Sequence, residues 1–599
     1  MMSSITAPAK HAPACVLHDT LTVMSADVTL DRDGRRAVRG LPDFVSSLAG
    51  DDEPGLAVGV YSAGELVSSA TAGCAVPEHG VPVTEHTAFD IASVSKHMTS
   101  ACMLLLAKDG LVDLDSDIRA CLPELSLTQP VTLRQSLTHT AGLRDYLALC
   151  ELTGIPVLGL SENRAVDLIT GQRELDFAPG SAFSYSNTGY VLAAALVRRI
   201  TGAGLARFAS ERLFGPLGMT ATHFRDDVAR LVPRLAGGYV VAPAAEADRP
   251  GEFGPRGEAG ARGEAGARFR RYDVTETVVG DGAVVTSVAD LAAWHGFMAS
   301  GAVLGVDIRD GLLAGQVLTD GRPAGYALGL ASIEVGGEAA WWHSGSWAGY
   351  RSAVIYLPGR QAGISVLANR NDPYPSNVAL AAAEALVTGT DIRVCYEAVT
   401  GVPVPREHAS REASEMTGLW HEPAQDLFLE LEARDGQITV RDHDDEHVFA
   451  LCADGRWHGT GVAAGSTYTA GDGTLTAGWG PSARLTDRYV RAEPGPHRPS
   501  WSEGPAGNFV NKESGASASI QASDAGDAEI TIALAAPRRL VPAGAGVWST
   551  DPGSTVTVRV ADDGAALLVS TPGVHHLRFE PATDAAADLM ILRGLRGAR

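Results

Sequence analysis

The chain has 599 residues, of which 45% are hydrophobic and 20% are charged, as in an ordinary globular protein. This length exceeds what one hydrophobic core usually supports, so about two to four domains are expected. The formal net charge of −23 and the isoelectric point near 5.1 argue against nucleic acid and anionic membranes as partners.

Other features of the composition bear on the cellular compartment. No apolar run approaches the roughly 18 residues needed to cross a membrane, and residues 1–25 predict a flexible tail without the apolar stretch of a secretory signal. The seven cysteines are scattered, and none forms a Cys-x-x-Cys motif. This pattern fits neither a disulfide framework nor a zinc site, so reduced thiols, a cytoplasmic location and no metal or other cofactor are expected.

Residues 26–400 predict one large domain that mixes helices and strands. A β-hairpin turns at Ala63-Gly64, and a long helix from Ser93 to Asp109 ends at Gly110. A further helix is expected to begin at Asp290. The other expected elements are the hairpin strands Leu56–Tyr61 and Glu65–Thr71, the helices Leu133–Leu137 and Thr188–Arg199, and the strands Ala340–His343, Ser352–Tyr356 and Gly363–Leu367.

A low-complexity stretch interrupts this domain at residues 243–268. The hexapeptide Gly-Glu-Ala-Gly-Ala-Arg occurs twice in succession, beginning at Gly257 and at Gly263. Glycine and charge at this density cannot bury enough apolar area to fold, so a disordered surface insertion is expected.

From about residue 405 the helical periodicity disappears. Short alternating segments such as Val556–Val560 follow one another, separated by Asp-Gly and other glycine-rich turns. A strand about every 8 to 12 residues indicates antiparallel β structure. The stretch is too long for one small barrel, and residues 491–507 are rich in Pro, Gly and Glu. Two similar antiparallel β domains are therefore expected, at residues 411–500 and 501–599.

Ser93 and Lys96 form a Ser-x-x-Lys pair at the predicted start of the long helix. Only four lysines occur in the chain, whereas arginine provides the other 44 of its 48 basic side chains. Arginine stays protonated, but a desolvated lysine can lose its proton and act as a base. The spacing alone would also fit a capped helix start with a solvated lysine. The hypothesis of a reactive pair therefore depends on partners elsewhere in the chain.

Three further motifs supply such partners. The chain has one Tyr-x-Asn, one His-x-Gly and one phrase His-Thr-Ala-Gly-Leu, which are Tyr185-Ser-Asn187, His343-Ser-Gly345 and the segment that begins at His139. The first two motifs also have structural explanations. Tyr185 could line a wall, Asn187 could cap a helix, and His343 could be a hydrogen-bonded strand histidine.

These motifs, in this order, resemble those of the serine hydrolases that include class C β-lactamases, D-alanyl-D-alanine carboxypeptidases, esterases and D-aminopeptidases. Members of that family have Ser-x-x-Lys, then Tyr-x-Asn, then a triplet that begins with Lys or His and ends in Gly. Surrounding phrases are similar too, among them Phe89-Asp-Ile-Ala-Ser-Val-Ser-Lys96 and Phe214-Gly-Pro-Leu-Gly-Met219. The resemblance implies an α+β domain, in which helices and a helical subdomain flank an antiparallel sheet, and hydrolysis through an acyl-enzyme.

The side chains themselves suggest how such a site would act. Residues three apart share a helix face, so Lys96 can reach the hydroxyl of Ser93, which needs a base to become a nucleophile. The amine must then be partly neutral near pH 7, well below its free pKa of about 10.4. Tyr185 is the second candidate base, or the acid that protonates the leaving amine, and the sequence leaves both roles open.

The remaining candidates would bind the substrate. The backbone N–H groups of Ser93 and Ser346 would form an oxyanion hole, and Asn187 would orient Lys96 or the substrate carbonyl. Penicillin-recognising members usually have Lys-Thr-Gly as the third motif, whose ammonium holds the substrate carboxylate. Here His343 and Gly345 form that motif with no lysine nearby, which argues against an efficient β-lactamase and against a strict carboxypeptidase.

The two expected β domains resemble those of D-aminopeptidases, which implies that each is an antiparallel β-barrel. In those enzymes a loop of the last barrel reaches the active site and restricts it to small substrates with a free amino terminus. Asp551 is the candidate acceptor for that ammonium, although it could equally be a turn aspartate before Pro-Gly. The hypothesis is thus a D-stereospecific aminopeptidase for small peptides or amides, with a homodimer left open. The alternatives are an esterase or broad-specificity peptidase of the same fold, and an inactive domain that binds peptidoglycan fragments.

Overall fold

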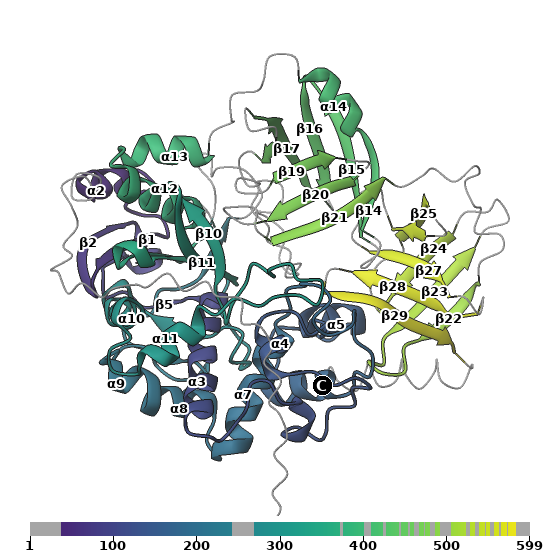
Figure 1. The fold of residues 1–599 in the computed structure, drawn as a ribbon, viewed down its shortest axis with the longest axis horizontal. Coiled ribbons are helices and arrows are strands. Elements are labelled where there is room, and N and C mark those ends of the chain that lie inside the picture. Colours follow the sequence, from purple (N-terminus) through teal and green to yellow (C-terminus); the bar gives the residue numbers. More distant parts are fainter. Residues whose placement is uncertain are drawn as a thin grey trace, which may run out of the picture.

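The computed structural model describes residues 38–241, 269–371 and 375–400, and most of residues 409–582. In the last range the undescribed positions are 423–426, 443–444, 453–455, 460–466, 472–473, 480–484, 492–504, 523–527, 534–537, 545–546, 551–555, 562–564 and 572. An α+β domain is followed by two β-barrels (Figure 1), which confirms the fold class expected from the sequence. Residues 1–25, the insertion at 243–268 and Asp551 lie outside the described residues.

The α+β domain is built on a six-stranded antiparallel sheet. Its strands are β1 (Leu56–Ser62), β2 (Glu65–Ala72), β10 (Ala331–Val335), β11 (Glu338–Trp347), β12 (Tyr350–Leu357) and β13 (Ala362–Ala368). They lie in the order β10-β11-β12-β13-β1-β2. The predicted hairpin forms β1 and β2, and Ala63 and Gly64 turn it with φ of 47° and 90°. Because β1 also pairs with β13 along its whole length, strands from the two ends of the domain meet in the middle of the sheet.

Apolar side chains bury both faces of this sheet. Along β12, Ala353 and Ile355 face one core, whereas Val354 and Tyr356 face the other, as the alternation of a strand requires. Helices cover the two faces (Figure 1). The helices on the first face are α2 (Leu41–Ser46), α12 (Pro375–Thr388) and α13 (Ile392–Thr400), and those on the second include α10 (Val288–Ser300) and α11 (Val306–Leu312).

A helical subdomain and several short strands lie beyond the second face. Its helices are α3 (Lys96–Lys108), α4 (Leu133–Leu137), α5 (Tyr146–Thr153), α6 (Glu162–Thr170), α7 (Thr188–Thr201), α8 (Leu205–Ala209) and α9 (Gly215–Leu217). The short strands are β3 (Cys74–Val76), β4 (Val81–Pro82), β5 (Phe89–Asp90), β6 (His223–Phe224), β7 (Tyr239–Val241), β8 (Phe269–Arg271) and β9 (Val284–Thr286).

The long helix α3 begins three residues later than the sequence predicts. Residues Ala92–Ser95 form a 3₁₀ turn, and the α-helix starts at Lys96. Ala92 has a φ of 47°, and its N–H donates to Asp90 Oδ1 at 2.7 Å, so the backbone before Ser93 is fixed in a turn. The 3₁₀ turn continues directly into α3, so Ser93 and Lys96 still occupy neighbouring turns of one helical segment.

The two C-terminal barrels are each closed by eight antiparallel strands. The first is formed by β14 (Gly418–Glu422), β15 (Leu427–Arg434), β16 (Gln437–Asp442), β17 (Asp445–Leu451), β18 (Trp457–Gly459), β19 (Thr467–Gly471), β20 (Thr474–Trp479) and β21 (Leu485–Arg491). The second is formed by β22 (Gly507–Val510), β23 (Ser517–Ala522), β24 (Ala528–Ile532), β25 (Arg538–Gly544), β26 (Val547–Ser549), β27 (Thr557–Val560), β28 (Leu567–Thr571) and β29 (Val574–Pro581).

The barrels differ in how their cores relate to the first domain. The first barrel, preceded by α14 (Ser410–Met416), has a core of its own that includes Trp420, Leu431 and Phe449. Buried side chains of the second barrel, such as Phe579, instead belong to the same apolar cluster as Leu149 of α5. Figure 1 shows α5 beside β28 and β29. The second barrel therefore packs against the helical subdomain.

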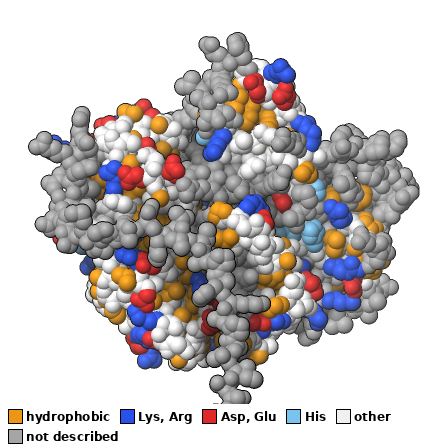
Figure 2. All heavy atoms as spheres, viewed as in Figure 1, with side chains coloured by type: hydrophobic (Ala, Val, Ile, Leu, Met, Phe, Trp, Pro, Cys, Tyr) orange, Lys and Arg blue, Asp and Glu red, His pale blue; other side chains and the backbone are white. Residues whose placement is uncertain are grey.

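Three further observations concern the surface, the helices and the cysteines of the described residues. On the face shown in Figure 2, acidic and basic side chains of the described residues are interspersed. In the described part of the chain, no helix combines the length and hydropathy required to cross a lipid bilayer. Six of the seven cysteines belong to the described residues, and all six are free thiols.

Candidate active site

The Ser-x-x-Lys pair is in direct contact. Lys96 Nζ lies 2.9 Å from Ser93 Oγ, 2.8 Å from Asn187 Oδ1 and 2.7 Å from the backbone oxygen of Asp281. The amide oxygen and the carbonyl oxygen can only accept hydrogen bonds. When Lys96 is neutral, its two N–H bonds are used by these two oxygens, so its lone pair faces Ser93 Oγ.

Burial prepares Lys96 for that neutral state. The residue is fully buried, and desolvation lowers the pKa of its amine from 10.5 to about 8. The carboxylates of Asp281 and Asp145 act in the opposite direction and keep the pKa from falling further. An appreciable fraction of Lys96 is therefore unprotonated at neutral pH.

Asn187 is at the N-cap position of α7, as the helix-capping alternative proposes, but its side chain makes no capping hydrogen bond. Its Oδ1 accepts from Lys96 instead. The backbone N–H of Asn187 donates to Asp145 Oδ2 at 2.6 Å, which fixes the residue at the start of the helix. Asn187 thus orients the amine of Lys96.

Tyr185 lies beside the Ser93–Lys96 pair. Its hydroxyl hydrogen-bonds with Ser93, and Lys96 Nζ lies 5.0 Å from the centre of its ring. Desolvation holds the pKa of the Tyr185 phenol well above 10, although the hydrogen bond from Ser93 opposes this shift. The side chain is partly exposed, at 38%. A neutral phenol that remains open to solvent beside the serine can donate a proton to a leaving group.

His343 is buried in β11 and has both ring nitrogens engaged. Nδ1 lies 2.5 Å from the backbone oxygen of Ser344, and Nε2 lies 2.7 Å from the hydroxyl of Tyr326. Because a carbonyl only accepts, the hydrogen is on Nδ1, and Nε2 accepts from Tyr326. Burial, with a smaller effect of Lys96, lowers the pKa of His343 to about 3. His343 is thus a neutral, hydrogen-bonded strand histidine near Tyr185, with their ring centres 6.2 Å apart.

Gly345 allows the third motif to approach the serine turn. A Cβ at this position would lie 2.2 Å from the backbone oxygen of Ile91 and 2.3 Å from Ser352 Oγ. No side chain larger than hydrogen fits there, so β11 passes directly beside the segment that carries Ser93. Ser346, the next residue, is exposed. Its N–H and that of Ser93 therefore belong to adjoining segments, as an oxyanion hole requires.

Several residues around the site carry no motif that would identify them from sequence. Tyr326 lies in a loop before β10, and Asp281 contributes its backbone oxygen, which every residue type has. Asp145 follows the His-Thr-Ala-Gly-Leu segment closely, but nothing in the sequence predicts its contact with Asn187. The motif at His139 predicts no role for that side chain. In the structure it is buried, its Nδ1 accepts from the N–H of Ser186 at 3.1 Å, and its ring packs 4.3 Å from that of Tyr185.

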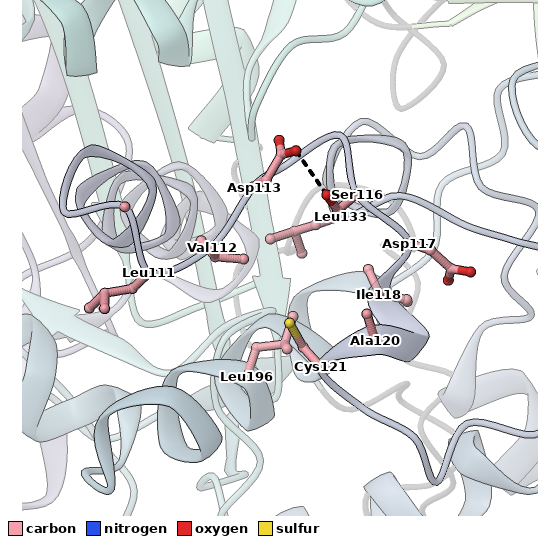
Figure 3. Close-up of a pocket in the computed structure, with 11 residues that line it drawn as sticks. Leu111, Val112, Asp113, Ser116, Asp117, Ile118, Ala120, Cys121, Leu133 and Leu196 are labelled. Carbon is pink, nitrogen blue, oxygen red and sulfur yellow. Dashed lines mark hydrogen bonds between the residues drawn. The ribbon is translucent and has the colours of Figure 1, made fainter.

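A separate hollow of about 410 Å³ lies near the C-terminal end of α3 (Figure 3). Its lining is largely apolar and includes Leu111, Ile118 and Leu196. The carboxylate of Asp113 accepts from Ser116 at 2.8 Å, and that of Asp117 pairs with Arg119 at 2.6 Å. The acids of this hollow are therefore occupied, and none of the residues that surround Ser93 lines it.

Known proteins resemble this chain in sequence and in fold. The chain is 27% identical to the D-aminopeptidase of Gluconobacter oxydans (strain 621H) over 390 residues, which are 65% of this chain and 67% of that protein. It is 27% identical to the D-aminopeptidase of Cereibacter sphaeroides (strain KD131 / KCTC 12085) over 527 residues, 87% of this chain and 91% of that protein. The crystal structure of SurE shares the fold with a TM-score of 0.50 and 23% identity, covering 76% of this chain and 99% of SurE.

The family follows from the extent of the match. Residues 37–389, more than half of the chain, match the Beta-lactamase family model. The resemblance inferred from the motifs is thereby confirmed, and the chain is a hydrolase of the β-lactamase fold that belongs to the Beta-lactamase family.

Proposed function

We propose that this protein is a serine hydrolase that forms an acyl-enzyme on Ser93 and releases N-terminal D-amino acids from small peptides or amides. The observation that carries the proposal is the buried Lys96, whose two carbonyl-type partners direct its lone pair to Ser93. The D-aminopeptidase names of relatives at 27% identity support the substrate class.

In the proposed acylation, Lys96 is the base. The pKa of its amine is lowered to about 8, whereas the pKa of the Tyr185 phenol is raised, so at neutral pH the amine is the stronger candidate to accept a proton. Ser93 Oγ attacks the substrate carbonyl as its proton passes to Lys96 Nζ. The carbonyl π electrons move to oxygen, where the N–H groups of Ser93 and Ser346 would stabilise the charge.

Collapse of this intermediate would release the amine. The oxygen lone pair re-forms the carbonyl as the carbon–nitrogen bond breaks, and Tyr185 donates a proton to the departing nitrogen. The proton held by Lys96 then passes to the Tyr185 phenolate by way of solvent, because Ser93 Oγ is now an ester oxygen without a proton, and both groups return to their neutral forms. A water then takes the place of the amine and attacks the ester carbonyl as Lys96 accepts its proton. The bond between the carbonyl carbon and Ser93 Oγ breaks, and Lys96 returns the proton to Oγ.

The state of His343 argues against penicillin-like substrates. A substrate carboxylate would require a cation at this motif, but burial holds the pKa of His343 at about 3, so the ring is uncharged at neutral pH. Its one N–H is already donated to Ser344. A small amide or peptide without a carboxylate at that position suits the site better.

Four chromogenic substrates test the proposal: D-alanine p-nitroanilide, its L-enantiomer, a short-chain nitrophenyl ester and a cephalosporin. We expect hydrolysis of the D-anilide to be much faster than that of the L-anilide, and its loss in Ser93→Ala. Mass spectrometry should locate the acyl group on Ser93. Rapid ester hydrolysis without any D-anilide hydrolysis would favour the esterase instead, and full activity of Ser93→Ala would exclude the acyl-enzyme.

A further inference from the structure

A turn of the second barrel touches the helical subdomain next to the active site. The backbone oxygen of Gly573, between β28 and β29, accepts a hydrogen bond from the N–H of Asp145 at 2.6 Å. Gly573 has a φ of 79°, and a Cβ there would lie 2.8 Å from Asp145 Cβ. Both the left-handed conformation and the close approach therefore require glycine.

Two further bonds join the barrel to the residues beside Asp145. The N–H of His575 donates to Asp176 Oδ1 at 2.8 Å, and the same oxygen lies 3.3 Å from Arg144 Nε. Arg144 Nη1 lies 3.0 Å from Oε2 of Glu513, which belongs to the barrel. The side chains of Arg144 and Asp176 are 4% and 2% exposed. Buried charges of this kind are costly unless every partner is in place, so this contact has one preferred geometry.

Asp145 transmits that geometry to the active site. It is the N-cap of α5, where its Oδ1 accepts from the N–H of Leu147 at 2.9 Å. Its other oxygen accepts from the N–H of Asn187, whose side chain holds Lys96. A continuous set of hydrogen bonds thus runs from Gly573 through Asp145 and Asn187 to Lys96.

We propose that the turn between β28 and β29 of the second barrel positions the Asn187–Lys96 pair through Asp145. The second barrel then acts on the chemistry from behind the site, by holding the residues that aim the amine at Ser93. Gly573 is a positioning residue in this scheme, because it touches neither the substrate nor the reacting atoms. The inference rests on the proposed role of Ser93 and Lys96 but not on the identity of the substrate.

The position of Asp145 also affects the protonation of Lys96. Its carboxylate raises the pKa of the amine, so moving it away lowers that pKa. The other titratable groups that face Lys96 are Asp281, His139, His343, Tyr185 and Tyr190. The atoms nearest to a Cβ at Gly573 belong to Asp145 and Ala148, so a change at the turn reaches Lys96 through Asp145.

Gly573→Ala in the full chain tests the proposal, with Gly507→Ala as the matched control. Gly507 is also in the second barrel and has a positive φ of 121°, but a Cβ there meets nothing within 4 Å. For Gly573→Ala we expect kcat on the nitrophenyl ester to fall about tenfold or more, with little change in KM, because a small misplacement of catalytic groups is costly. The apparent pKa of Lys96 in the pH profile of kcat/KM should also decrease. Gly507→Ala should change neither.

A second pair of variants keeps the proposal falsifiable if Gly573→Ala folds poorly. Glu513→Gln removes the charge that holds Arg144, whereas Glu529→Gln removes an exposed charge from β24 of the same barrel. The first should lower kcat several-fold and the second should not. A folded Gly573→Ala enzyme with the kcat and pH profile of the wild type would overturn the proposal. Equal losses of kcat in each variant and its control would overturn it too. Each variant is compared with the wild type on the nitrophenyl ester. The outcome therefore does not depend on whether the enzyme prefers the D-anilide to the L-anilide.

Discussion

Asn187 begins helix α7, yet its side chain serves Lys96 rather than the helix. Asn187 Oδ1 accepts from Lys96 Nζ at 2.8 Å, and no helix N–H bonds to the asparagine side chain. Together with the backbone oxygen of Asp281, this contact uses both N–H bonds of the neutral amine. The direction of the lone pair towards Ser93 is therefore a property of the fold before any substrate binds.

Replacing the lysine by a permanently charged residue should abolish acylation. In Lys96→Arg the guanidinium stays protonated and cannot accept the proton of Ser93. We expect a loss of about a thousandfold or more in kcat/KM for any substrate of the enzyme. Lys108→Arg is the control, because Lys108 is 45% exposed and pairs with Asp307 on the surface. Substantial activity in Lys96→Arg would mean that another group, such as Tyr185, is the base.

A carboxylate in place of the Asn187 amide should move the pH dependence in a defined direction. Lys96 acts as a base only when neutral, and its pKa is about 8. In Asn187→Asp a further negative charge contacts the amine and raises that pKa. The rising limb of kcat/KM should therefore move to higher pH. Because a pKa higher by one leaves about a tenth as much neutral amine, activity at pH 7 should fall about tenfold for each such step.

Asn163→Asp is the control for this variant. Asn163 lies in α6, and its side-chain oxygen is 3.5 Å from Arg198 on the exposed surface. The substitution introduces the same charge far from Lys96, so its pH profile should match that of the wild type. A profile of Asn187→Asp that stays in place or moves to lower pH would contradict the role of Lys96 as the titrating base.

The sequence predicted which candidate side chains lie together, because each stands in a motif with fixed spacing. Ser93 and Lys96 are three residues apart on one helical segment, and that local geometry already brings them into contact. The contributions of Asp281 and Tyr326 could not be predicted, since one acts through a backbone oxygen and the other from a loop with no periodic pattern. Local rules also missed the start of α3, where the positive φ of Ala92 forms a 3₁₀ turn.

The contact between the barrel and Asp145 escaped prediction for a different reason. Gly573 and Asp145 are far apart in the sequence, and neither residue stands in a sequence pattern that predicts a contact between them. Alternation and turns predict two antiparallel β domains, but the way these domains dock depends on side-chain packing between domains. Asp551, predicted to bind the substrate ammonium, lies outside the described residues, so its role stays a prediction.

Burial of Lys96 should also make stability depend on pH. The pKa of its amine is about 8 in the folded protein and 10.5 in the unfolded chain, so between these values the unfolded state binds more protons. Stability due to this group therefore rises with pH across that window and is lowest below pH 8. Lys96→Met removes the ionisation. From pH 7 to 10 the wild type should gain about 2 to 3 kcal/mol relative to this variant.

Chemical unfolding of both proteins across this pH range measures the difference. Lys108→Met, which alters a half-exposed lysine of the same helix, is the matched control, and the gain expected relative to Lys96→Met should not appear relative to this variant. If the difference in the free energy of unfolding between the wild type and Lys96→Met stayed constant with pH, the pKa of Lys96 would be the same in the folded and unfolded chains. Burial would then not favour the neutral amine that acts as the base.

Gly345→Ala tests whether β11 must lie against the serine turn. The added Cβ would meet the backbone oxygen of Ile91 at 2.2 Å and Ser352 Oγ at 2.3 Å, and backbone cannot move aside cheaply. The strand should shift away from Ser93 and widen the pair of N–H groups that bind the oxyanion. We expect kcat to fall about a hundredfold, as for loss of one oxyanion donor.

Gly359→Ala controls for the effect of the methyl group itself. Gly359 lies in the turn between β12 and β13 of the same sheet, and the nearest atom to a Cβ there is a Glu338 oxygen at 3.9 Å. This variant should retain wild-type kcat. If Gly345→Ala also retained it while its thermal midpoint fell, the glycine would serve packing alone. Ser346 would then have no part in binding the oxyanion, because the strand that carries its N–H could be displaced without cost to the reaction.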